Sequence, residues 1–594
     1  MYGVYVRDPS VSRFAAGRLS PERRLADLDR LRQERFDVLI IGGGVTGAGA
    51  ALDAASRGLS VALVEARDLA SGTSSRSSKL IHGGLRYLEQ FDLGLVHEAL
   101  RERGLLATRL APHLVRPTPF LLPLPRRSWR SGLLRGYYGA GVAMYDTFAG
   151  LVGGGRGMPL HRHLSATAAR RIFPSLRDDT VGGAIRYYDA QVDDARLVTT
   201  LARTAASLGA AVVTSARATR FLRAAREVTG VRVEDVETGD SFDVQAGTVI
   251  AATGVWSDDV AEMLTLGGGP FRPGLRVRAS KGVHLVVPRG AISGEAGLIL
   301  RTVKSVLFVI PWGGHWIIGT TDTDWRLDRA HPAASAKDIE YLLAEVNTVL
   351  DRPLSTSDIE GVYAGLRPLL AGEDESTSAL SREHAVIEPM LGLMLVAGGK
   401  LTTYRVMAAD VVNHAVRRLG SGAPARSRTD QLPLLGADGY RQLWGERVEL
   451  ALRHGVSVGV AEHLLERYGS VAVDVLALAV SSSKLARPVE GAPGYLAAEI
   501  AYAASSEGAL HLEDALARRT RISFETAHRG VKSAAHTAEI MGDVLGWDDA
   551  RRAREVEHYL AQVEAERESQ RMPDDQTADA ARLGAPDVRH FSAI

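Results

Sequence analysis

Short apolar runs and small-residue stretches alternate at the start of the chain. Between residues 36 and 65, the apolar run FDVLIIG precedes a glycine- and alanine-rich stretch that ends at Gly58, and a second apolar run, LSVALVE, follows. Short β-branched runs of this kind predict buried parallel strands, and the stretch between them predicts a helix. The pattern therefore predicts a strand–helix–strand unit of the length that binds half of a dinucleotide.

The pattern changes further along the chain. In the centre, RLVTTLARTAASLGAAVVT reads as a helix and a strand, and TVIAATG, GVHLVVP, SVLFVIPW and HWIIGTTD read as further strands. From about residue 430 the segments become long and rich in Ala, Glu, Arg and Leu, so a separate helical domain is expected. Leu25, Leu28 and Leu31 predict a short amphipathic helix near the N-terminus.

Composition narrows the chemistry that such a chain can perform. Its 594 residues, 45% hydrophobic and 24% charged, are ordinary for a soluble enzyme of several domains. The 71 basic and 70 acidic residues leave a formal charge of +1, which gives no reason to expect a nucleic-acid partner. The absence of cysteine excludes disulfides, thiolate nucleophiles and cysteine-ligated metals, and no cluster of His and acidic residues has metal-ligand spacing. Redox chemistry would therefore need a bound organic cofactor.

Neither a secretory signal nor a membrane-spanning helix is expected. Residues 1–36 carry charges throughout and lack the apolar centre of a signal peptide. The most apolar stretch, GYYGAGVAMYDTFAGLVGGG from residue 136, is interrupted by glycines and by Asp146. These features and the missing cysteines fit a protein of a reducing compartment.

The first strand–helix unit carries a dinucleotide motif. Gly42, Gly44 and Gly47 form G-x-G-x-x-G directly after the first strand. In this motif the first glycine permits the turn, the second lets a pyrophosphate approach the backbone, and the third lets helix and strand pack closely. Glu65 ends the second strand, where an acid can accept a hydrogen bond from a ribose hydroxyl. The combination predicts dinucleotide binding rather than a structural glycine turn.

Two later segments favour FAD over NAD. An apolar strand precedes Thr253 and Gly254, and another strand runs into Gly398 and Gly399, with a helix beginning near Leu401. A helix N-terminus at that point would suit the electron-rich pyrimidine end of a reduced flavin. Three separated segments that converge on one ligand fit FAD better than NAD.

The stretch SSRSSKLIHGGLRYLE, residues 74–89, groups several cations around a pair of glycines. It has no helical or strand periodicity. It is either a solvated loop or a segment whose cations face an anionic ligand that the glycines allow to come close.

Five motifs together resemble one family. SSKLIHGGLRYLE, DARLV, IIGTTD, GLRPLL and GGKLTTYR resemble the FAD-dependent sn-glycerol-3-phosphate dehydrogenases. The resemblance runs from about residue 36 to 410 and continues more loosely through EDALARRTRIS. It implies an α/β fold with a glutathione-reductase-type, Rossmann-like FAD-binding domain, an antiparallel-sheet substrate domain and a C-terminal all-helical domain.

The resemblance also implies an activity. Members of this family oxidise sn-glycerol 3-phosphate to dihydroxyacetone phosphate by hydride transfer to FAD and pass the electrons to membrane quinone. It implies a cytoplasmic protein attached peripherally to the inner face of the cell membrane, and leaves open whether the chain forms a homodimer.

The expected domain boundaries follow from the motifs and the change in pattern. An N-terminal extension is expected over 1–35, a helical domain over 430–572 and a flexible tail over 573–594. Residues 36–429 are expected to interleave two domains, with FAD-binding segments at about 36–110, 190–265 and 355–420 and substrate segments at about 111–189 and 266–354.

The resemblance assigns substrate-binding and catalytic roles. Arg86, Arg367 and Arg382 are expected to hold the phosphate or the neighbouring oxygens, although an arginine in isolation is more often a surface ion pair. His284 is the candidate general base, because an ordinary histidine pKa lies near working pH; the alternative is a structural histidine on a strand. Lys400 could stabilise the developing alkoxide or the charge on the reduced flavin. Tyr87 and Thr320 could supply hydrogen bonds.

A larger set of residues is expected to hold the cofactor. Donors around the flavin diphosphate are implied by the resemblance alone for Ser74, Ser75, Ser78 and Lys79. The remaining expected FAD contacts are Gly42, Gly44, Gly47, Glu65, Thr253, Gly254, Gly399, Lys400, Leu401 and Thr402.

One cationic and aromatic segment gives the membrane expectation local support. Residues 126–138, RRSWRSGLLRGYY, interleave four arginines with Trp, Leu and Tyr side chains. Aromatic residues favour the lipid interface and cations favour anionic headgroups. The alternative is an arm that packs on the protein or on a second subunit.

Other functions remain open from sequence. An α-glycerophosphate oxidase would reduce dioxygen instead of quinone. Another FAD-dependent amine or hydroxy-acid oxidase of the same fold would need fewer arginines, because an amino acid requires only one carboxylate clamp. A flavin-binding scaffold or a tRNA-modifying flavoprotein is disfavoured by the balanced charge and by the presence of both His284 and Lys400.

Overall fold

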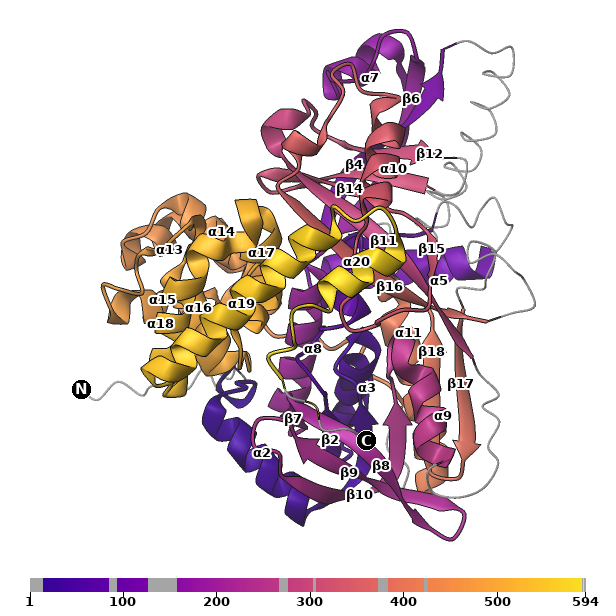
Figure 1. The fold of residues 1–594 in the computed structure, drawn as a ribbon, viewed down its shortest axis with the longest axis vertical. Helices are drawn as coiled ribbons and strands as arrows, with labels where there is room; N and C mark the ends of the chain where they lie inside the picture. The colour runs from indigo at the N-terminus through magenta and orange to yellow at the C-terminus, as the bar shows by residue number, and fades with distance from the viewer. Residues whose placement is uncertain are drawn as a thin grey trace.

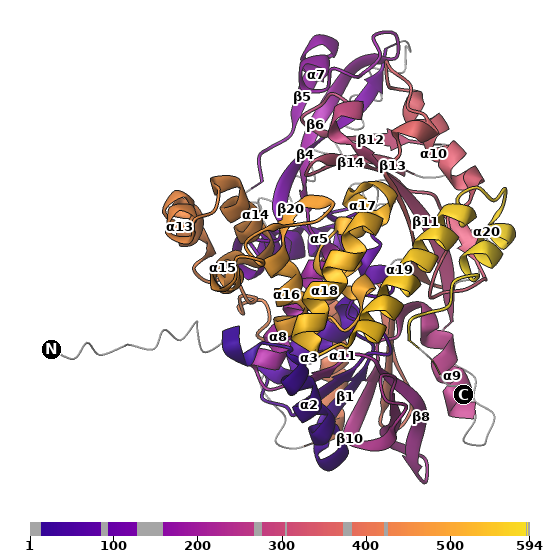
Figure 2. The same ribbon diagram turned by 60° about the vertical axis from the view of Figure 1, so that its left-hand side comes forward.

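Two β-sheets and a helical domain make up the protein (Figure 1). The computed structural model describes residues 14–84, 93–126, 158–265, 276–302, 306–371, 383–420, 426–589 and 591. Figure 2 shows the helical domain lying against the region where the two sheets meet. Arg86, Tyr87, Arg382 and the cationic segment after Arg126 lie outside the described residues.

The first sheet has eight strands in the order β17-β18-β10-β1-β2-β7, with β8 and β9 continuing antiparallel from β10. The strands β7, β2, β1, β10 and β18 run parallel. Their bounds are β1 (Arg35–Ile41), β2 (Val61–Val64), β7 (Ala211–Val213), β8 (Ala216–Ala224), β9 (Glu227–Asp235), β10 (Ser241–Ala251), β17 (His384–Met390) and β18 (Leu393–Gly398).

The predicted strand–helix–strand unit is β1, α3 (Val45–Ser56) and β2. All three elements are largely buried: β1 and β2 are mostly apolar, and seven of the ten buried residues of α3 are Gly or Ala. Small side chains let α3 lie close to its neighbours α8 (Asp194–Ser207) and α11 (Tyr404–Leu419). The parallel sheet therefore has the architecture expected of a dinucleotide-binding domain.

The second sheet has ten strands and is almost entirely antiparallel. Its path is β15-β11-β14-β13-β12-β4-β6-β3, with β16 beside β11 and β5 beside β6. Among these described strands, only β4 and β12 pair in parallel. The bounds are β3 (Leu80–Ile81), β4 (Arg116–Pro125), β5 (Arg162–Ser165), β6 (Val181–Gln191), β11 (Val277–Pro288), β12 (Gly297–Arg301), β13 (Val306–Trp312), β14 (His315–Gly319), β15 (Thr323–Trp325) and β16 (Gly361–Leu370).

One expected boundary is wrong. The segment after residue 355 was expected in the FAD-binding part, but β16 pairs with β11 from Gly361 to Leu370 and so belongs to the antiparallel sheet. The chain returns to the parallel sheet only at β17. The ten consecutive residue pairs between β16 and β11 place this segment in the antiparallel sheet, even though its position in the sequence suggested the FAD-binding part.

The remaining helices before residue 430 cover the two sheets. Ser20 caps α2 (Pro21–Gln33) by accepting from the N–H of Arg23, and Leu28 and Leu31 are buried, as the spacing predicted. Leu25 is exposed. The others are α5 (Leu93–Leu105), α7 (Ala166–Ile172), α9 (Ser257–Thr265) and α10 (Ala336–Asn347).

The C-terminal domain is helical, as predicted, with one short hairpin of β19 (Pro488–Val489) and β20 (Ala492–Leu496). Its apolar side chains form two clusters, one of which also includes Phe14 from the N-terminal segment. The helices are α12 (Tyr440–Gly445), α13 (Arg447–His454), α14 (Val458–Tyr468), α15 (Ala472–Ser481), α16 (Ala497–Ser506), α17 (Ile522–Glu525), α18 (Ala534–Leu545), α19 (Asp549–Ser569) and α20 (Asp575–Arg582).

Buried ion pairs join the helical domain to the sheets. Asp68, fully buried, accepts from Arg518 at 2.6 Å and from Arg519 at 2.6 and 2.9 Å. Arg521 pairs with Asp193 and, at 2.6 Å, with Asp194 at the start of α8. The motif EDALARRTRIS therefore supplies an interdomain contact rather than a part of the reaction site.

The expectation of a flexible C-terminal tail is wrong for the described residues beyond 572. Asp574 caps α20 by accepting from the N–H of Thr577, and Ala578, Arg582 and Arg589 are buried. Figures 1 and 2 show α20 continuing from α19 toward β11 and α10. The low hydrophobicity of this segment suggested disorder, but ion pairs with residues far away in sequence fix it in place.

Candidate active site

A large cavity extends between the two sheets. It has a volume of about 1120 Å³ and is lined by both sheets and their connecting loops. Pockets for small ligands usually measure about 300–1,000 Å³, so this cavity can hold an extended ligand. The expected site residues that line it are Gly42, Gly44, Glu65, Ser74, Ser78, Thr253, Gly254, His284, Thr320, Arg367, Gly399, Lys400 and Leu401.

A side chain on any of the three glycines of the first turn would clash with the backbone or enter the cavity. Gly42 adopts a φ of 110°, and a Cβ on it would lie 2.6 Å from the carbonyl oxygen of Ala252. A Cβ on Gly47 would overlap the carbonyl oxygen of Gly42, so only glycine allows α3 to start this close to β1. A Cβ on Gly44 would meet only Ser74 Oγ at 3.3 Å and would otherwise enter the cavity. This glycine therefore leaves room for a ligand at the start of α3.

Glu65 follows β2, and its carboxylate binds the backbone of the turn between β1 and α3. Its Oε2 accepts from the N–H of Gly43 at 2.6 Å, and its Oε1 accepts from the N–H of Arg67 at 2.8 Å. Burial raises the pKa of Glu65, although both backbone hydrogen bonds oppose that rise. A carboxylate held in this way at the carboxyl end of β2 is placed to accept a ribose hydroxyl.

Another part of the cavity wall is formed by the end of β18, the turn before α11 and the end of β10. Gly398 and Gly399 both have a φ of 77°, and Lys400 precedes a short helical turn that leads into α11. Thr253 and Gly254 line the cavity at the carboxyl end of β10. The three separated segments that favoured FAD in the sequence thus meet at one cavity.

Arg367 is oriented by several contacts on the antiparallel sheet. Its Nη2 donates to Thr320 Oγ1 at 3.0 Å and to the Thr321 carbonyl at 3.1 Å, and its Nη1 donates to Ser280 Oγ at 3.2 Å. A Cβ on Gly282 would lie within 2.6 Å of both Thr320 Oγ1 and the guanidinium. Glycine at this position of β11 is therefore what lets Arg367 lie across the strand.

His284 lies two residues beyond Gly282 on the same face of β11, because side chains alternate along a strand. Its ring stacks on Tyr363 with a centroid separation of 4.7 Å, and Nε2 lies 2.8 Å from Ser78 Oγ. Nδ1 is enclosed and has no hydrogen-bond partner among the described residues. Burial, then Arg367 and Lys79, lower the pKa of His284 well below its ordinary value. The imidazole is therefore neutral at neutral pH and has a free lone pair, but it is a weaker base than the ordinary histidine that the sequence led us to expect.

Four expected cofactor residues do not line the cavity. Gly47 packs beneath the turn, and Ser75 is buried. Lys79 is fully buried, and its Nζ donates to both oxygens of Asp194 at 2.7 and 2.9 Å, so it joins the interdomain ion network instead of pointing at a diphosphate. Thr402 Oγ1 accepts from the N–H of His82. Ser78 lines the cavity but contacts His284.

No candidate metal site or membrane span accompanies this cavity. Within the described ranges, no group of three His, Asp or Glu side chains is arranged to hold a metal ion. Among the same residues, no helix has the length and apolar character to cross a bilayer.

Comparison with known proteins identifies the family. Residues 37–405 match the model of the FAD dependent oxidoreductases, and residues 427–552 match that of the C-terminal domain of alpha-glycerophosphate oxidase. The chain is 55% identical over 577 residues to glycerol-3-phosphate dehydrogenase 2 of Mycobacterium tuberculosis. This alignment covers 97% of this chain and 96% of that protein. The chain belongs to the FAD-dependent glycerol-3-phosphate dehydrogenase family.

Two further glycerol-3-phosphate dehydrogenases extend the comparison. The mitochondrial protein of Bos taurus is 38% identical over 561 residues, or 90% of this chain and 74% of that one. The X-ray structure of the Bacillus halodurans protein complexed with FAD superposes with a TM-score of 0.74 at 27% identity, over 92% of this chain and 98% of that one. The predicted fold class and the predicted FAD cofactor are thereby confirmed.

The cavity of this glycerol-3-phosphate dehydrogenase family member fits FAD by its own geometry. One cavity contains the space in front of Gly44, the carboxylate of Glu65 and the glycine pair before Lys400. FAD contains a diphosphate, a ribose and a flavin, which are the groups that these features accommodate.

Several cavity residues were missed from the sequence. Arg67 lies two residues after Glu65, so its position after the second strand was a usable signal. Arg76 was noted in the cationic stretch but given no role, and Arg301 ends a strand with no recognisable motif. Arg217 and Phe591 come from distant segments and carry no sequence signal.

Proposed function

We propose that this protein oxidises sn-glycerol 3-phosphate to dihydroxyacetone phosphate and delivers the electrons to a membrane quinone. The observation that carries the substrate assignment is the convergence of His284, Arg367 and Lys400 on one cavity. A neutral base, an oriented guanidinium and an ammonium suit a substrate that carries both a hydroxyl and a phosphate. FAD, when bound, supplies the hydride acceptor.

Arg367 positions the phosphate in this proposal. Because Thr320, Thr321 and Ser280 fix the plane of its guanidinium, the donors are oriented before the substrate arrives. Lys400 stabilises negative charge that develops on the substrate oxygen or on the cofactor. Arg86, Tyr87 and Arg382, which lie outside the described residues, remain proposed substrate contacts.

His284 removes the proton of the substrate hydroxyl in this proposal. Nδ1 is enclosed, so the proton reaches Nε2, which contacts Ser78 Oγ on the cavity wall. Ser78 can pass a proton because a hydroxyl both donates and accepts a hydrogen bond. The other expected FAD contacts that line the cavity remain proposed binding residues, namely Gly42, Gly44, Glu65, Ser74, Thr253, Gly254, Gly399 and Leu401.

Anaerobic reduction of the flavin tests the substrate. Adding sn-glycerol 3-phosphate to the FAD-loaded protein should bleach the flavin absorbance, and glycerol should do so very poorly because it lacks the phosphate. Equal reduction by glycerol and by its phosphate would contradict the substrate assignment. A flavin that neither compound reduces would contradict the proposed activity altogether.

Quinone as acceptor is proposed over dioxygen because two relatives that are 54% and 55% identical to this chain are named dehydrogenases. We further propose a cytoplasmic protein that binds the inner face of the membrane peripherally, with the cationic segment after Arg126 as the contact. Sedimentation with anionic liposomes should decrease as salt increases. If the protein ignores such liposomes and makes stoichiometric peroxide in air, it is an oxidase.

A further inference from the structure

The C-terminal segment leaves the helical domain and reaches the cofactor cavity. After α20, residues 583–589 and Phe591 lie against the parallel sheet, and Phe591 lines the cavity itself. Asp575, at the start of α20, pairs with the fully buried Lys281 of β11 at 2.6 Å. The segment is therefore attached before it reaches the cofactor domain.

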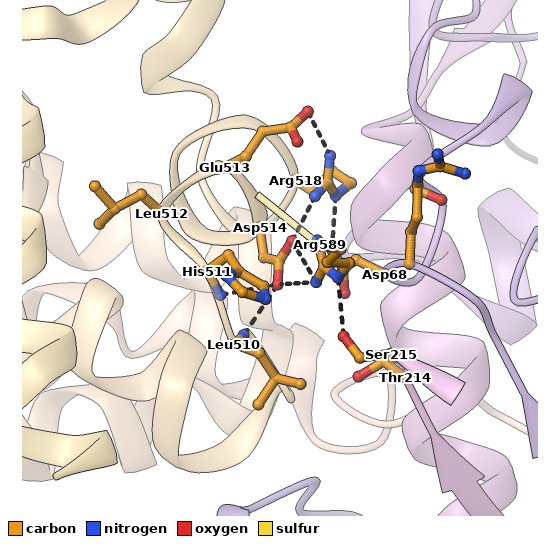
Figure 3. Close-up of polar contacts among 12 residues, drawn as sticks. Asp68, Thr214, Ser215, Leu510, His511, Leu512, Glu513, Asp514, Arg518 and Arg589 are labelled. Atoms are coloured by element: carbon orange, nitrogen blue, oxygen red, sulfur yellow. Dashed lines mark hydrogen bonds and ion pairs between the residues drawn. The ribbon is translucent and has the colours of Figure 1, made fainter. Parts of the chain in front are cut away.

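Arg589 is the second attachment (Figure 3). Its Nη2 donates to both carboxylate oxygens of Asp514, at 2.9 and 3.2 Å, and its Nε donates to Ser215 Oγ at 2.8 Å. Asp514 belongs to the helical domain, whereas Ser215 lies in the turn between β7 and β8. Arg589 is 4% exposed, so the segment is held by a buried contact that spans two domains.

Asp587 is the third attachment, and it leads to the cavity. Its Oδ2 accepts from Arg67 Nε at 3.0 Å and lies 3.3 Å from His331 Nε2. Arg67 is also the residue whose N–H donates to Glu65. The position of the C-terminal segment is therefore linked to the carboxylate that marks the ribose end of the dinucleotide site.

Two arginines lie on the ring of Phe591. The guanidinium carbon of Arg67 is 4.4 Å from the ring centroid and that of Arg217 is 5.3 Å from it. Both distances fall within the range of about 6 Å over which cations are attracted to an aromatic face. All three side chains line the cavity, as do Glu65 and the small residues Ala66, Ala216 and Ala218 that adjoin the two arginines in sequence. Small residues beside planar groups leave room for a flat ligand.

We propose that Phe591, together with Arg67 and Arg217, forms the adenine-binding subsite of FAD. Purine bases stack on aromatic rings and on guanidinium planes, and both kinds of surface are present here. The subsite lies at the Glu65 end of the cavity, where the adenosine half of a dinucleotide belongs in this fold. The C-terminal segment thus supplies a cofactor-binding residue from the far end of the chain.

The proposal rests on the assignment of the cavity to FAD, so the test compares two flavins. Apoprotein is titrated with FAD and with FMN, which lacks the adenosine half, and binding is followed by flavin fluorescence. Phe591→Ala should weaken FAD binding about 10-fold, the size expected for loss of one stacking contact, and leave FMN binding unchanged. Phe591→Tyr should retain wild-type affinity.

The matched control is Leu583→Ala, an exposed position of the same segment. It should change neither affinity. An equal loss of FAD and FMN binding in Phe591→Ala, or FAD binding that is unchanged or tighter, overturns the proposal. Wild-type protein that binds FAD but is not reduced by sn-glycerol 3-phosphate contradicts the proposed activity and leaves the subsite standing.

A second measurement does not depend on a substitution. If adenine stacks on Phe591, FAD should slow removal of the C-terminal residues by carboxypeptidase, whereas FMN should not. Asp587→Asn weakens the attachment to Arg67 and should speed both carboxypeptidase trimming and FAD release. Equal trimming with and without FAD would also overturn the proposal.

Discussion

At the scale of single residues, His284 is the side chain on which the proposed chemistry depends most. His284→Asn should slow flavin reduction by about 10²–10⁴-fold, the usual contribution of a general base, with a much smaller effect on substrate affinity. Ser78→Ala should slow the same step because it removes the hydroxyl that contacts Nε2 at 2.8 Å. Stopped-flow absorbance under anaerobic conditions measures both rates. Unchanged reduction in His284→Asn would remove it as the base.

Arg367 is expected to select for the phosphate. Arg367→Ala should cost about 1.5–3 kcal/mol for each charge-assisted bond lost to the substrate, and the preference for glycerol 3-phosphate over glycerol should fall accordingly. Arg326→Ala is the control, because its side chain is 82% exposed. The ratio of flavin reduction rates with the two substrates is the readout. A preserved ratio in Arg367→Ala would assign phosphate recognition to other residues.

His511 should make stability depend on pH. Burial and Arg589 lower its pKa, but the carboxylates of Glu237 and Glu555, each 2.8 Å away, outweigh them and raise the pKa to about 9. A raised pKa means that protonated His511 stabilises the fold below about pH 6.5 and that this contribution disappears as the pH rises through about 9. The stabilisation from protonated His511 should be on the order of 1–3 kcal/mol.

Denaturation of the FAD-loaded protein at pH 6.5 and pH 9 tests this expectation. The unfolding midpoint of His511→Gln should change less over that interval than the midpoint of the wild type. His97→Gln, at an exposed position on α5, should retain the wild-type dependence. Parallel pH profiles of His511→Gln and wild type would contradict the raised pKa.

At the scale of elements, the turn between β1 and α3 should determine whether the cofactor binds. Gly44→Val places a side chain where only Ser74 Oγ now approaches the position, and it should abolish FAD retention while the fold persists. Gly494→Val is the control, since nothing lies within 4 Å of a Cβ on that exposed strand residue. Flavin absorbance of the purified protein reports the result. A yellow Gly44→Val protein would contradict this use of the turn.

The pairing partners of the strands could not be predicted from the sequence. The sequence predicted a strand at GVHLVVP and contained GLRPLL as a family motif, but it did not show that β16 adds to β11 through ten residue pairs. Backbone hydrogen bonds between strands do not depend on side-chain identity, so the sequence of one strand does not name its partner. The assignment of residues 355–370 to the wrong sheet follows from this.

At the scale of the whole molecule, the buried ion pairs around Asp68 should hold the helical domain on the sheets. Asp68→Ala leaves Arg518 and Arg519 without the carboxylate that lies 2.6 Å from each, and should lower the free energy of unfolding by about 3–5 kcal/mol. Asp29→Ala, at a side chain that is 65% exposed, should change it by less than about 0.5 kcal/mol. Thermal unfolding monitored by circular dichroism compares them. Equal midpoints would show that apolar packing alone joins the domains.

The sequence by itself determined the cofactor class and the main architecture. Gly42, Gly44, Gly47 and Glu65 lie within 24 consecutive residues, and their roles depend on local backbone geometry, which a short segment specifies by itself. The long helical segments after residue 430 were predictable for the same reason, because periodicity is a local property. Five motifs then sufficed to indicate the family.

Only the tertiary structure decided which charged side chains meet the cavity and which hold the domains together. Lys79 lies beside Ser78 in sequence, yet it is fully buried against Asp194 while Ser78 lines the cavity. Phe591 reaches Arg67 and Arg217 across more than 370 residues of chain, and ion pairs of Asp587 and Arg589 hold a polar tail that composition alone suggests is mobile. A charge has no intrinsic partner in the sequence; folding selects one by burying both groups together.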